Sequence, residues 1–188
     1  MARLVVLASG NGSTLQALLD DPQVGPQIVA TGTDVAGCRA VRRAAASGVA
    51  TFTITLRDYP DRPAWNDALA EAIAGYDPDL VVLAGFMRIL APSVVGRFRI
   101  INTHPALLPA FPGAHAVRDA LAAGVPVTGV TVHWVDEGVD TGPVIAQCEV
   151  PVHPGDDEDS LRARVQAVEK PLYVNTIRTL CSTAGALR

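Results

Sequence analysis

Asn102 and His104, two positions apart in the run NTHP, are the side chains of this sequence best suited to acyl-transfer chemistry. We expect a short strand at residues 100–102 that gives way to a proline-rich segment, so both side chains can face the same side. An asparagine amide and an imidazolium are suitable donors to an oxyanion that forms during acyl transfer. The alternative is structural: Asn102 ties down a turn and His104 is a buried, hydrogen-bonded histidine. For an isolated Asn-x-His pair this alternative is the commoner case.

An acidic, glycine-containing segment at residues 135–143 could supply the partner of this histidine. It carries Asp136, Glu137 and Asp140, with glycines at positions 138 and 142. This composition predicts a hairpin loop that folds over a site, and Asp140 held beside His104 would favour the charged imidazolium. The alternative is a solvated acidic turn.

The run SGNGST at residues 9–14 is a candidate phosphate site. It lies between an apolar strand and a helical pattern, where glycines allow a ligand to approach the backbone and the first amides of a helix attract an anion. Ser13 and Thr14 add hydroxyl groups. The run matches neither GxGxxG nor a P-loop, so an ordinary turn capped by Ser13 is equally compatible.

A metal site is the weaker interpretation of the histidines. His104, His115 and His133 could join Asp140 as zinc ligands, but no HxxxH or HxH spacing supports that arrangement. We expect no metal.

The elements that must position these residues alternate between short apolar runs and helical patterns. This order predicts a single-domain, open α/β fold with a mostly parallel, twisted sheet, flanking helices and an antiparallel C-terminal strand pair. Expected strands cover residues 3–8, 27–31, 51–55, 80–84, 100–102, 128–135 and 143–150. Expected helices cover residues 14–19, 39–47, 64–74, 116–123 and 160–180, and Pro171 should end or kink the last one. The carboxyl edge of such a sheet is where ligands bind.

The composition excludes several classes of protein. The chain has 188 residues, 49% hydrophobic and 18% charged, with 15 basic and 19 acidic side chains and a net charge of −4. These values fit one folded domain and give no support to a nucleic-acid binder. No apolar stretch has the length of a signal peptide or a membrane span, so we expect a cytoplasmic protein. The three cysteines, Cys38, Cys148 and Cys181, match no zinc pattern and are expected to be reduced and packed like small hydrophobic residues.

Taken together, the motifs resemble one family across essentially the whole chain. They are SGNGS at 9–13, LAGFMRIL at 83–90, NTHPALLP at 102–109, FPGAH at 111–115, and the segments 133–143 and 163–169. In this order they resemble phosphoribosylglycinamide formyltransferase, the folate-dependent GAR transformylase of purine biosynthesis.

The resemblance implies a Rossmann-like formyltransferase fold and transfer of a formyl group from 10-formyltetrahydrofolate to the amine of GAR. It also implies a phosphate-binding half at about residues 1–100 and a catalytic, folate-binding half at about 101–188. Asn102, His104 and Asp140 match the family's catalytic trio. The residues that match GAR-binding positions are Gly12, Ser13, Thr14, Gln166, Ala167, Val168 and Glu169. Those that match folate-binding positions are Arg62, Met87, Arg88, Ile89, Leu90, Asn102, Asp136, Glu137, Gly138, Val139 and Asp140.

The implied partners are these two small molecules, with no metal, nucleic acid or membrane, and the chain acts as a monomer or a homodimer. Both ligands are anionic while the chain is net negative, so we expect local donors to bind them: the amides of the first helix, Arg62 and Arg88.

Two positions depart from the family pattern. Thr14 stands where many relatives have asparagine, and Gly32-Thr33-Asp34 replaces a more usual Ser-Asn pair, so we assign no role to it.

Two alternatives remain. Another formyltetrahydrofolate enzyme, a hydrolase or a transferase acting on a different amine such as methionyl-tRNA, would share these motifs but carry an appended domain, for which we expect no room here. A non-catalytic binding domain would explain the glycine-rich turn but not the oxyanion donors beside a carboxylate loop.

Overall fold

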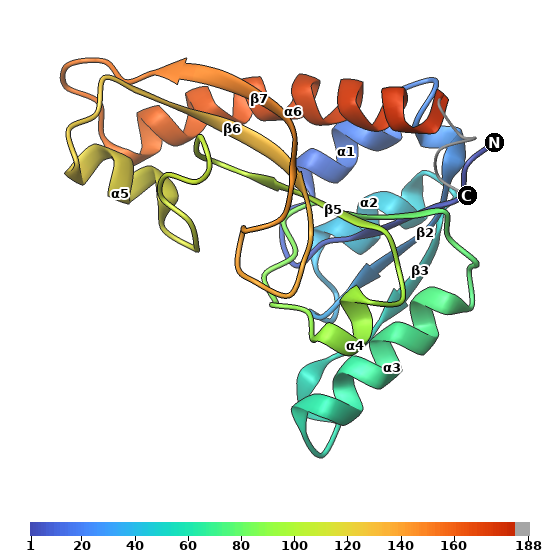
Figure 1. Cartoon of the computed structure of the whole chain (residues 1–188). Coiled ribbons are helices and arrows are strands. Elements are labelled where there is room, and N and C mark those ends of the chain that lie inside the picture. Colours follow the sequence, from blue (N-terminus) through green and yellow to red (C-terminus); the bar gives the residue numbers. More distant parts are fainter. Residues whose placement is uncertain (183–188) are drawn as a thin grey trace.

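The computed structural model describes residues 1–182 and has a seven-stranded sheet flanked by helices on both faces (Figure 1). The strands are β1 (Leu4–Leu7), β2 (Ile28–Thr33), β3 (Ala50–Thr53), β4 (Leu80–Leu83), β5 (Ile100–His104), β6 (Val127–Trp134) and β7 (Val144–Pro151). The helices are α1 (Ser13–Leu19), α2 (Arg39–Ala46), α3 (Arg62–Ala74), α4 (Pro92–Val95), α5 (Ala116–Ala122) and α6 (Glu158–Ser182), with short 3-10 turns η1 (Gly25–Gln27) and η2 (Leu56–Asp58).

The strand order is β3-β2-β1-β4-β5-β6-β7. The first five strands are parallel, whereas β6 is antiparallel to both β5 and β7. The predicted fold class is therefore confirmed. The order reverses between β1 and β4, which places the topological switch point there; in open α/β sheets, ligands bind in the crevice outside the carboxyl ends of the strands at such a point. The loops after β1 and β4 are therefore the expected walls of a site.

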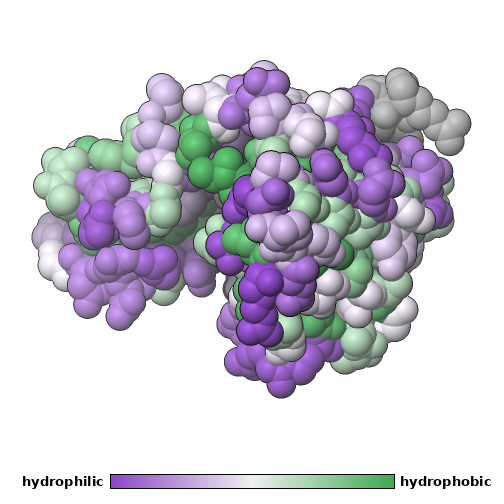
Figure 2. Space-filling model, turned by 90° about the horizontal axis from the view of Figure 1, so that it is seen from below, coloured by the Kyte–Doolittle hydropathy of each residue, from purple (hydrophilic) through white to green (hydrophobic). Residues whose placement is uncertain are grey.

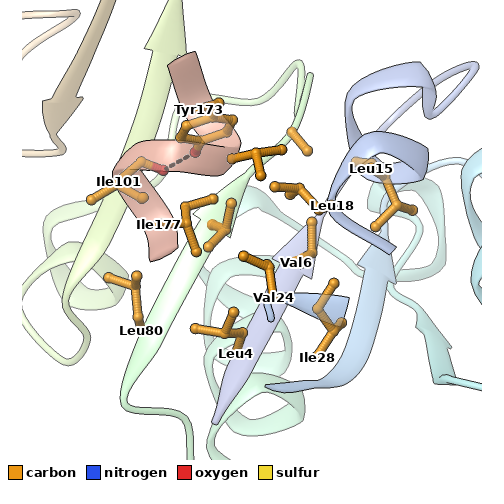
Figure 3. Packing of buried hydrophobic residues seen from close by; sticks show 14 of the residues in the cluster. Leu4, Val6, Leu15, Leu18, Val24, Ile28, Leu80, Ile101, Tyr173 and Ile177 are labelled. Carbon is orange, nitrogen blue, oxygen red and sulfur yellow. Dashed lines mark hydrogen bonds between the residues drawn. The ribbon is translucent and has the colours of Figure 1, made fainter. Parts of the chain in front are cut away.

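Alternate residues of the central strands form two separate cores. In β1, Leu4 and Val6 pack on the face covered by α1, α2 and α6 (Figure 3), whereas Val5 and Leu7 pack on the face covered by α3 and α4. All four side chains are fully buried. Strands buried on both faces read as unbroken apolar runs, which is why LVVL at β1 and again at β4 was a reliable strand signal.

We expected Pro171 to end or kink the C-terminal helix; α6 runs unbroken through it, so the first of these two alternatives was wrong. A proline removes one helical hydrogen bond, but tertiary packing on both sides of it compensates. Before it, Leu161 and Val165 pack against β6 and β7. After it, the fully buried Tyr173 donates its hydroxyl proton towards the carbonyl oxygens of Leu83 and Ile101, at 3.0 and 3.1 Å. The helix is thus tied to the carboxyl end of β4, which borders the switch point, and to the neighbouring strand β5.

The cysteines only partly follow the expectation. All three are free thiols, and Cys181 is buried, which raises its pKa to about 11. Cys148, however, is exposed on the edge strand β7, where its neighbours Gln147 and Glu149 are exposed as well. No helix within residues 1–182 is long and apolar enough to cross a membrane.

Candidate active site

A cavity of about 530 Å³ lies at the carboxyl edge of the sheet. Viewed from below, the molecule is indented between the part that carries α5 and the part that carries α3, with hydrophobic side chains along the indentation (Figure 2). The cavity is lined by the segment after β4, the end of β5, His133 of β6 and the loop between β6 and β7. The predicted site residues that line it are Met87, Arg88, Ile89, Leu90, Asn102, His104, Asp136, Gly138, Val139 and Asp140. Glu137 and Arg62 do not line it.

His104 lies between two hydrogen-bond acceptors. Strand β5 extends through His104, two residues beyond its predicted end, so Asn102 and His104 share one side of a regular strand. Nδ1 of His104 is 3.2 Å from Oδ2 of Asp140, and its Nε2 is 2.8 Å from the carbonyl oxygen of Phe111. Because a carboxylate and a carbonyl oxygen can only accept, the doubly protonated imidazolium is the form that satisfies both contacts.

His133 joins Asn102 and Asp140 into one network. It is paired with Asn102 in the antiparallel β5–β6 register. Its Nδ1 lies 2.8 Å from the carbonyl oxygen of Trp134, so this nitrogen carries a proton. Its Nε2 faces both Nδ2 of Asn102, at 3.3 Å, and Oδ1 of Asp140, at 3.5 Å. The sequence suggests His133 only as a metal ligand, because its pairing with Asn102 depends on the β5–β6 register, which the sequence does not predict.

Asp140 is held in place by its backbone and by three donors. Its φ is +55°, and Oδ2 accepts a 2.8 Å hydrogen bond from the backbone N–H of Gly113. The hydrogen bond from His133, with the Gly113 amide and the charge of His104, lowers the pKa of Asp140 below its ordinary value. The carboxylate therefore stays ionised beside the imidazole rings. Within residues 1–182, no cluster of three or more His, Cys, Asp or Glu side chains has an arrangement that could hold a metal ion.

The glycine-rich turn packs directly against the start of α2. Gly12 has a φ of +71°, and a Cβ at this position would lie 2.7 Å from Cα of Ala40, so only glycine fits. The turn leads into α1, where Oγ1 of Thr14 donates a 3.1 Å hydrogen bond to Oε1 of Glu169 on α6. The predicted GAR-binding positions of the two helices are thus in contact at Thr14 and Glu169.

Burial raises the pKa of Glu169, one of the four predicted GAR-binding positions on α6. The neighbouring Gln166 and Ala167 are exposed, and Val168 packs against the apolar cluster that contains Leu161 and Val165.

Arg62 starts α3 and reaches the segment after β4. Its guanidinium lies over the ring of Trp65, 4.5 Å from the ring centre, and Nη2 donates a hydrogen bond to the carbonyl oxygen of Ile89. The stacking and the hydrogen bond place a cation beside the rim of the cavity.

Arg88 makes a contact that the sequence did not predict. Its Nε lies 2.6 Å from Oδ2 of the buried Asp34, so part of its charge is engaged within the protein. The prediction that Arg88 donates to an anionic ligand then concerns its two Nη groups, since Asp34 engages Nε. The sequence did contain a signal for this contact, because Asp34 directly follows a strand rich in β-branched residues and therefore lies at the carboxyl edge of the sheet, where ligands bind.

A second, shallower hollow of about 440 Å³ lies between α1 and α2. It is lined by Gln16, Arg39, Arg42, Arg43, Ala46 and Ser47, and it contains none of the predicted site residues.

Comparison with known proteins identifies the family of this chain. A family model described as formyl transferase matches residues 2–177. The chain belongs to the formyl transferase family. It is an enzyme by this membership, and the resemblance seen in its motifs is confirmed.

Within that family, the similarity is to phosphoribosylglycinamide formyltransferases. The chain is 55% identical to the one from Mycobacterium tuberculosis, over 96% of this chain and 86% of the relative. It is 43% identical to the one from Escherichia coli K12, over 90% of this chain and 82% of the relative. The crystal structure of glycinamide ribonucleotide transformylase 1 from Symbiobacterium toebii superposes with a TM-score of 0.91 and 44% identity, covering 95% of this chain and 86% of that one.

Proposed function

We propose that this chain transfers the formyl group of 10-formyltetrahydrofolate to the amine of phosphoribosylglycinamide, giving formyl-GAR and tetrahydrofolate for purine biosynthesis. The observation that carries the proposal is the position of His104, held between Asp140 and a carbonyl oxygen beside Asn102 in the cavity at the carboxyl edge of the sheet. The proposal includes a single functional domain and a cytoplasmic location.

The reaction is direct attack of the GAR amine on the formyl carbon. A C–N bond forms to the amine, and the carbonyl oxygen takes on negative charge. His104 and Asn102 donate to that oxygen, which replaces the carbonyl of Phe111 as the acceptor at Nε2 of His104. Each such donor is worth on the order of 3 kcal/mol in acyl transfer. The bond between the formyl carbon and the folate nitrogen then breaks, and the proton lost by the amine is delivered to that nitrogen. No covalent enzyme intermediate is needed.

Asp140 and His133 support the two donors. The ionised Asp140 keeps His104 charged and accepts from it at Nδ1. It also orients a water molecule that carries the amine proton to the leaving nitrogen. Nε2 of His133 lies beside both the Asn102 amide and Asp140, so this histidine helps to position both groups.

The two substrates approach from opposite sides of the switch point. The phosphate of GAR binds to Gly12, Ser13 and Thr14 at the start of α1, and its ribose and glycinamide contact the 166–169 turn of α6, with Glu169 as the main polar group.

The folate ring enters the cavity. Apolar side chains such as Leu90 and Val135 form its walls, and the backbone of residues 87–90 lies along its edge, a combination that suits a flat ring with hydrogen-bonding atoms. The loop that contains residues 136–140 closes over the ring. Arg62, at the rim, attracts the anionic glutamate of the folate.

The test is to mix the purified chain with GAR and a 10-formylfolate and to follow release of the deformylated folate. We expect turnover only when GAR is present. Release without GAR would indicate a formylfolate hydrolase, and an absence of turnover with GAR would remove the proposal. Sedimentation of the same sample decides between monomer and homodimer.

A further inference from the structure

The loops that follow three neighbouring strands meet at the buried carboxylate of Asp34. Strands β2, β1 and β4 are adjacent in the sheet, and their carboxyl ends lead to Asp34, to Ser9 and to residues 85–90, respectively. Ser9 is the first residue of the turn proposed to bind GAR. Residues 87–90 line the cavity proposed to bind the folate. Asp34 itself is 3% exposed and lines neither site.

Each carboxylate oxygen of Asp34 bonds to a different loop. Oδ1 accepts a 2.5 Å hydrogen bond from Oγ of Ser9, and Oδ2 accepts a 2.6 Å ion-paired hydrogen bond from Nε of Arg88. The loops are also joined directly, because Oγ of Ser9 accepts a 2.8 Å hydrogen bond from the backbone N–H of Met87. The Ser9 N–H in turn donates to the carbonyl oxygen of Gly85, at 3.0 Å. The result is a closed chain of polar contacts from one proposed substrate loop to the other.

The energetics favour keeping this network intact. A buried carboxylate that loses its partner is strongly destabilising, whereas a fully satisfied one is tolerated. Asp34 has both oxygens engaged, and its charge is balanced by a guanidinium that is 39% exposed. A shift of either loop away from Asp34 would leave a buried charge with an unsatisfied oxygen. The position of one loop therefore limits the position of the other.

The orientation of the folate segment follows from the same contact. Met87 and Ile89 are 75% and 66% exposed, whereas Arg88 between them turns inward to Asp34. The ion pair thus decides which side of residues 87–89 faces solvent, and the Ser9 hydroxyl bonds to the backbone of Met87. Asp34 acts through these two residues.

We propose that Asp34 is a positioning residue that couples the binding of the two substrates, so that GAR held at the 9–14 turn increases the affinity of the folate site, and the reverse. Such coupling is reciprocal by thermodynamic necessity. The inference rests on the proposed function for the identity of the substrates, and it concerns a position where this chain departs from the family pattern.

The first test is the kinetics of Asp34→Asn, which keeps the shape of the side chain and removes its charge. We expect the KM values for GAR and for 10-formyltetrahydrofolate both to rise about fivefold or more. We expect kcat to change much less, because Asp34 contacts neither the reacting atoms nor the catalytic trio. The matched control is Glu71→Gln, which breaks the exposed ion pair with Arg97 and should change neither KM. A fall in kcat with both KM values unchanged, or a change in one KM only, would overturn the proposal.

The second test measures coupling without turnover. Calorimetry gives the Kd of tetrahydrofolate, which has no formyl group to transfer, in the absence of GAR and at saturating GAR. In the unsubstituted chain GAR should lower this Kd by about fivefold or more, and in Asp34→Asn the ratio should approach one. Equal ratios in the two proteins, or a ratio of one in the unsubstituted chain, would contradict the inference. If Asp34→Asn does not fold, Ser9→Ala carries the same comparison, because it removes one arm of the network and leaves the ion pair.

The double variant Asp34→Asn/Arg88→Gln tests whether Asp34 acts through Arg88. Arg88 itself lines the folate cavity, so the comparison uses the KM for GAR. Removing both charges leaves no unpaired ion, so the rise in this KM should be no larger than that of Asp34→Asn alone. Effects that add would overturn the mechanism. The two proposals fail separately: no GAR-dependent turnover by the unsubstituted chain removes the proposed function, whereas turnover with coupling retained in Asp34→Asn removes only this inference.

Discussion

Oδ2 of Asp140 lies 3.2 Å from Nδ1 of His104, although His104 ends β5 and Asp140 lies in the loop between β6 and β7. The segment between β5 and α5 is fastened at the same point, because the backbone N–H of Gly113 donates to this oxygen of Asp140. The carboxylate thus orients the ring that we propose as the oxyanion donor.

Replacing Asp140 by asparagine should lower kcat about 100-fold or more, because the amide no longer stabilises the imidazolium. The KM for GAR should change little, since Asp140 is not in the proposed GAR site. Steady-state kinetics with each substrate varied separately measures both. Because the pKa of Asp140 is lowered, the unsubstituted enzyme should not lose activity through protonation of this carboxylate at pH 5 and above. Equal effects on kcat and on GAR affinity would indicate a binding role.

Replacing Arg62 by alanine should raise the KM for 10-formyltetrahydrofolate by about tenfold, since a hydrogen bond to a charged group contributes roughly 1.5 kcal/mol. The KM for GAR should stay the same. The matched control is Arg57→Ala, which removes an exposed arginine paired only with its neighbour Asp58. An unchanged folate KM in Arg62→Ala would remove this residue from the folate site.

Replacing Glu169 by glutamine should stabilise the protein and weaken GAR binding. Burial raises the pKa of Glu169, so this carboxyl group stabilises the folded state only while it is protonated. Its contribution to the free energy of unfolding is lost as the pH rises through the folded-state pKa. At pH 7 the neutral amide should raise Tm by about 2 °C, and the difference should vanish below about pH 4. Thermal unfolding at both pH values and the KM for GAR check this. Glu149→Gln, an exposed change on β7, should shift neither. A lower Tm for Glu169→Gln at pH 7 would contradict the prediction.

Replacing Asp156 by asparagine should reduce stability at neutral pH but not in acid. The guanidinium of Arg164 contacts both of its oxygens, at 2.7 and 2.9 Å, and with the N–H of His153 it holds the pKa of Asp156 well below its usual range. A lowered pKa gives stability that is present above about pH 4 and is lost as the pH falls through the folded-state value. When Tm is plotted against pH, the curves of Asp156→Asn and of the unsubstituted chain should therefore differ at neutral pH and converge in acid. Asp119→Asn, on the exposed Arg118 pair, is the control and should follow the unsubstituted chain.

Much of the fold was predictable because the central strands of the sheet are buried on both faces. Unbroken apolar runs such as LVVL in β1 and β4 are typical of strands that are buried on both faces. Gly12 and Gly48 have a positive φ, which favours glycine, and they mark the start of one helix and the end of another. Pro171 misled the prediction, because local propensity lost to the packing of α6 against the sheet.

The site was predictable as a set of residue types, not as a network. Asn102, His104 and Asp140 were recognisable as possible oxyanion donors and a carboxylate partner, and the resemblance to the formyltransferase family singled them out as a catalytic trio. Their distances were not, since the pairing of Asn102 with His133 depends on the strand register.

The sequence by itself thus determined the secondary-structure elements and the set of candidate site residues, because periodicity, turn residues and motifs act over a few positions of the chain. The contacts of Asp34 with Ser9 and Arg88, and of Thr14 with Glu169, were decided only by the folded sheet. The reason is geometric: a parallel sheet brings the carboxyl ends of neighbouring strands together whatever their separation in the chain. Which polar groups then pair depends on burial, because each buried charge must find a partner.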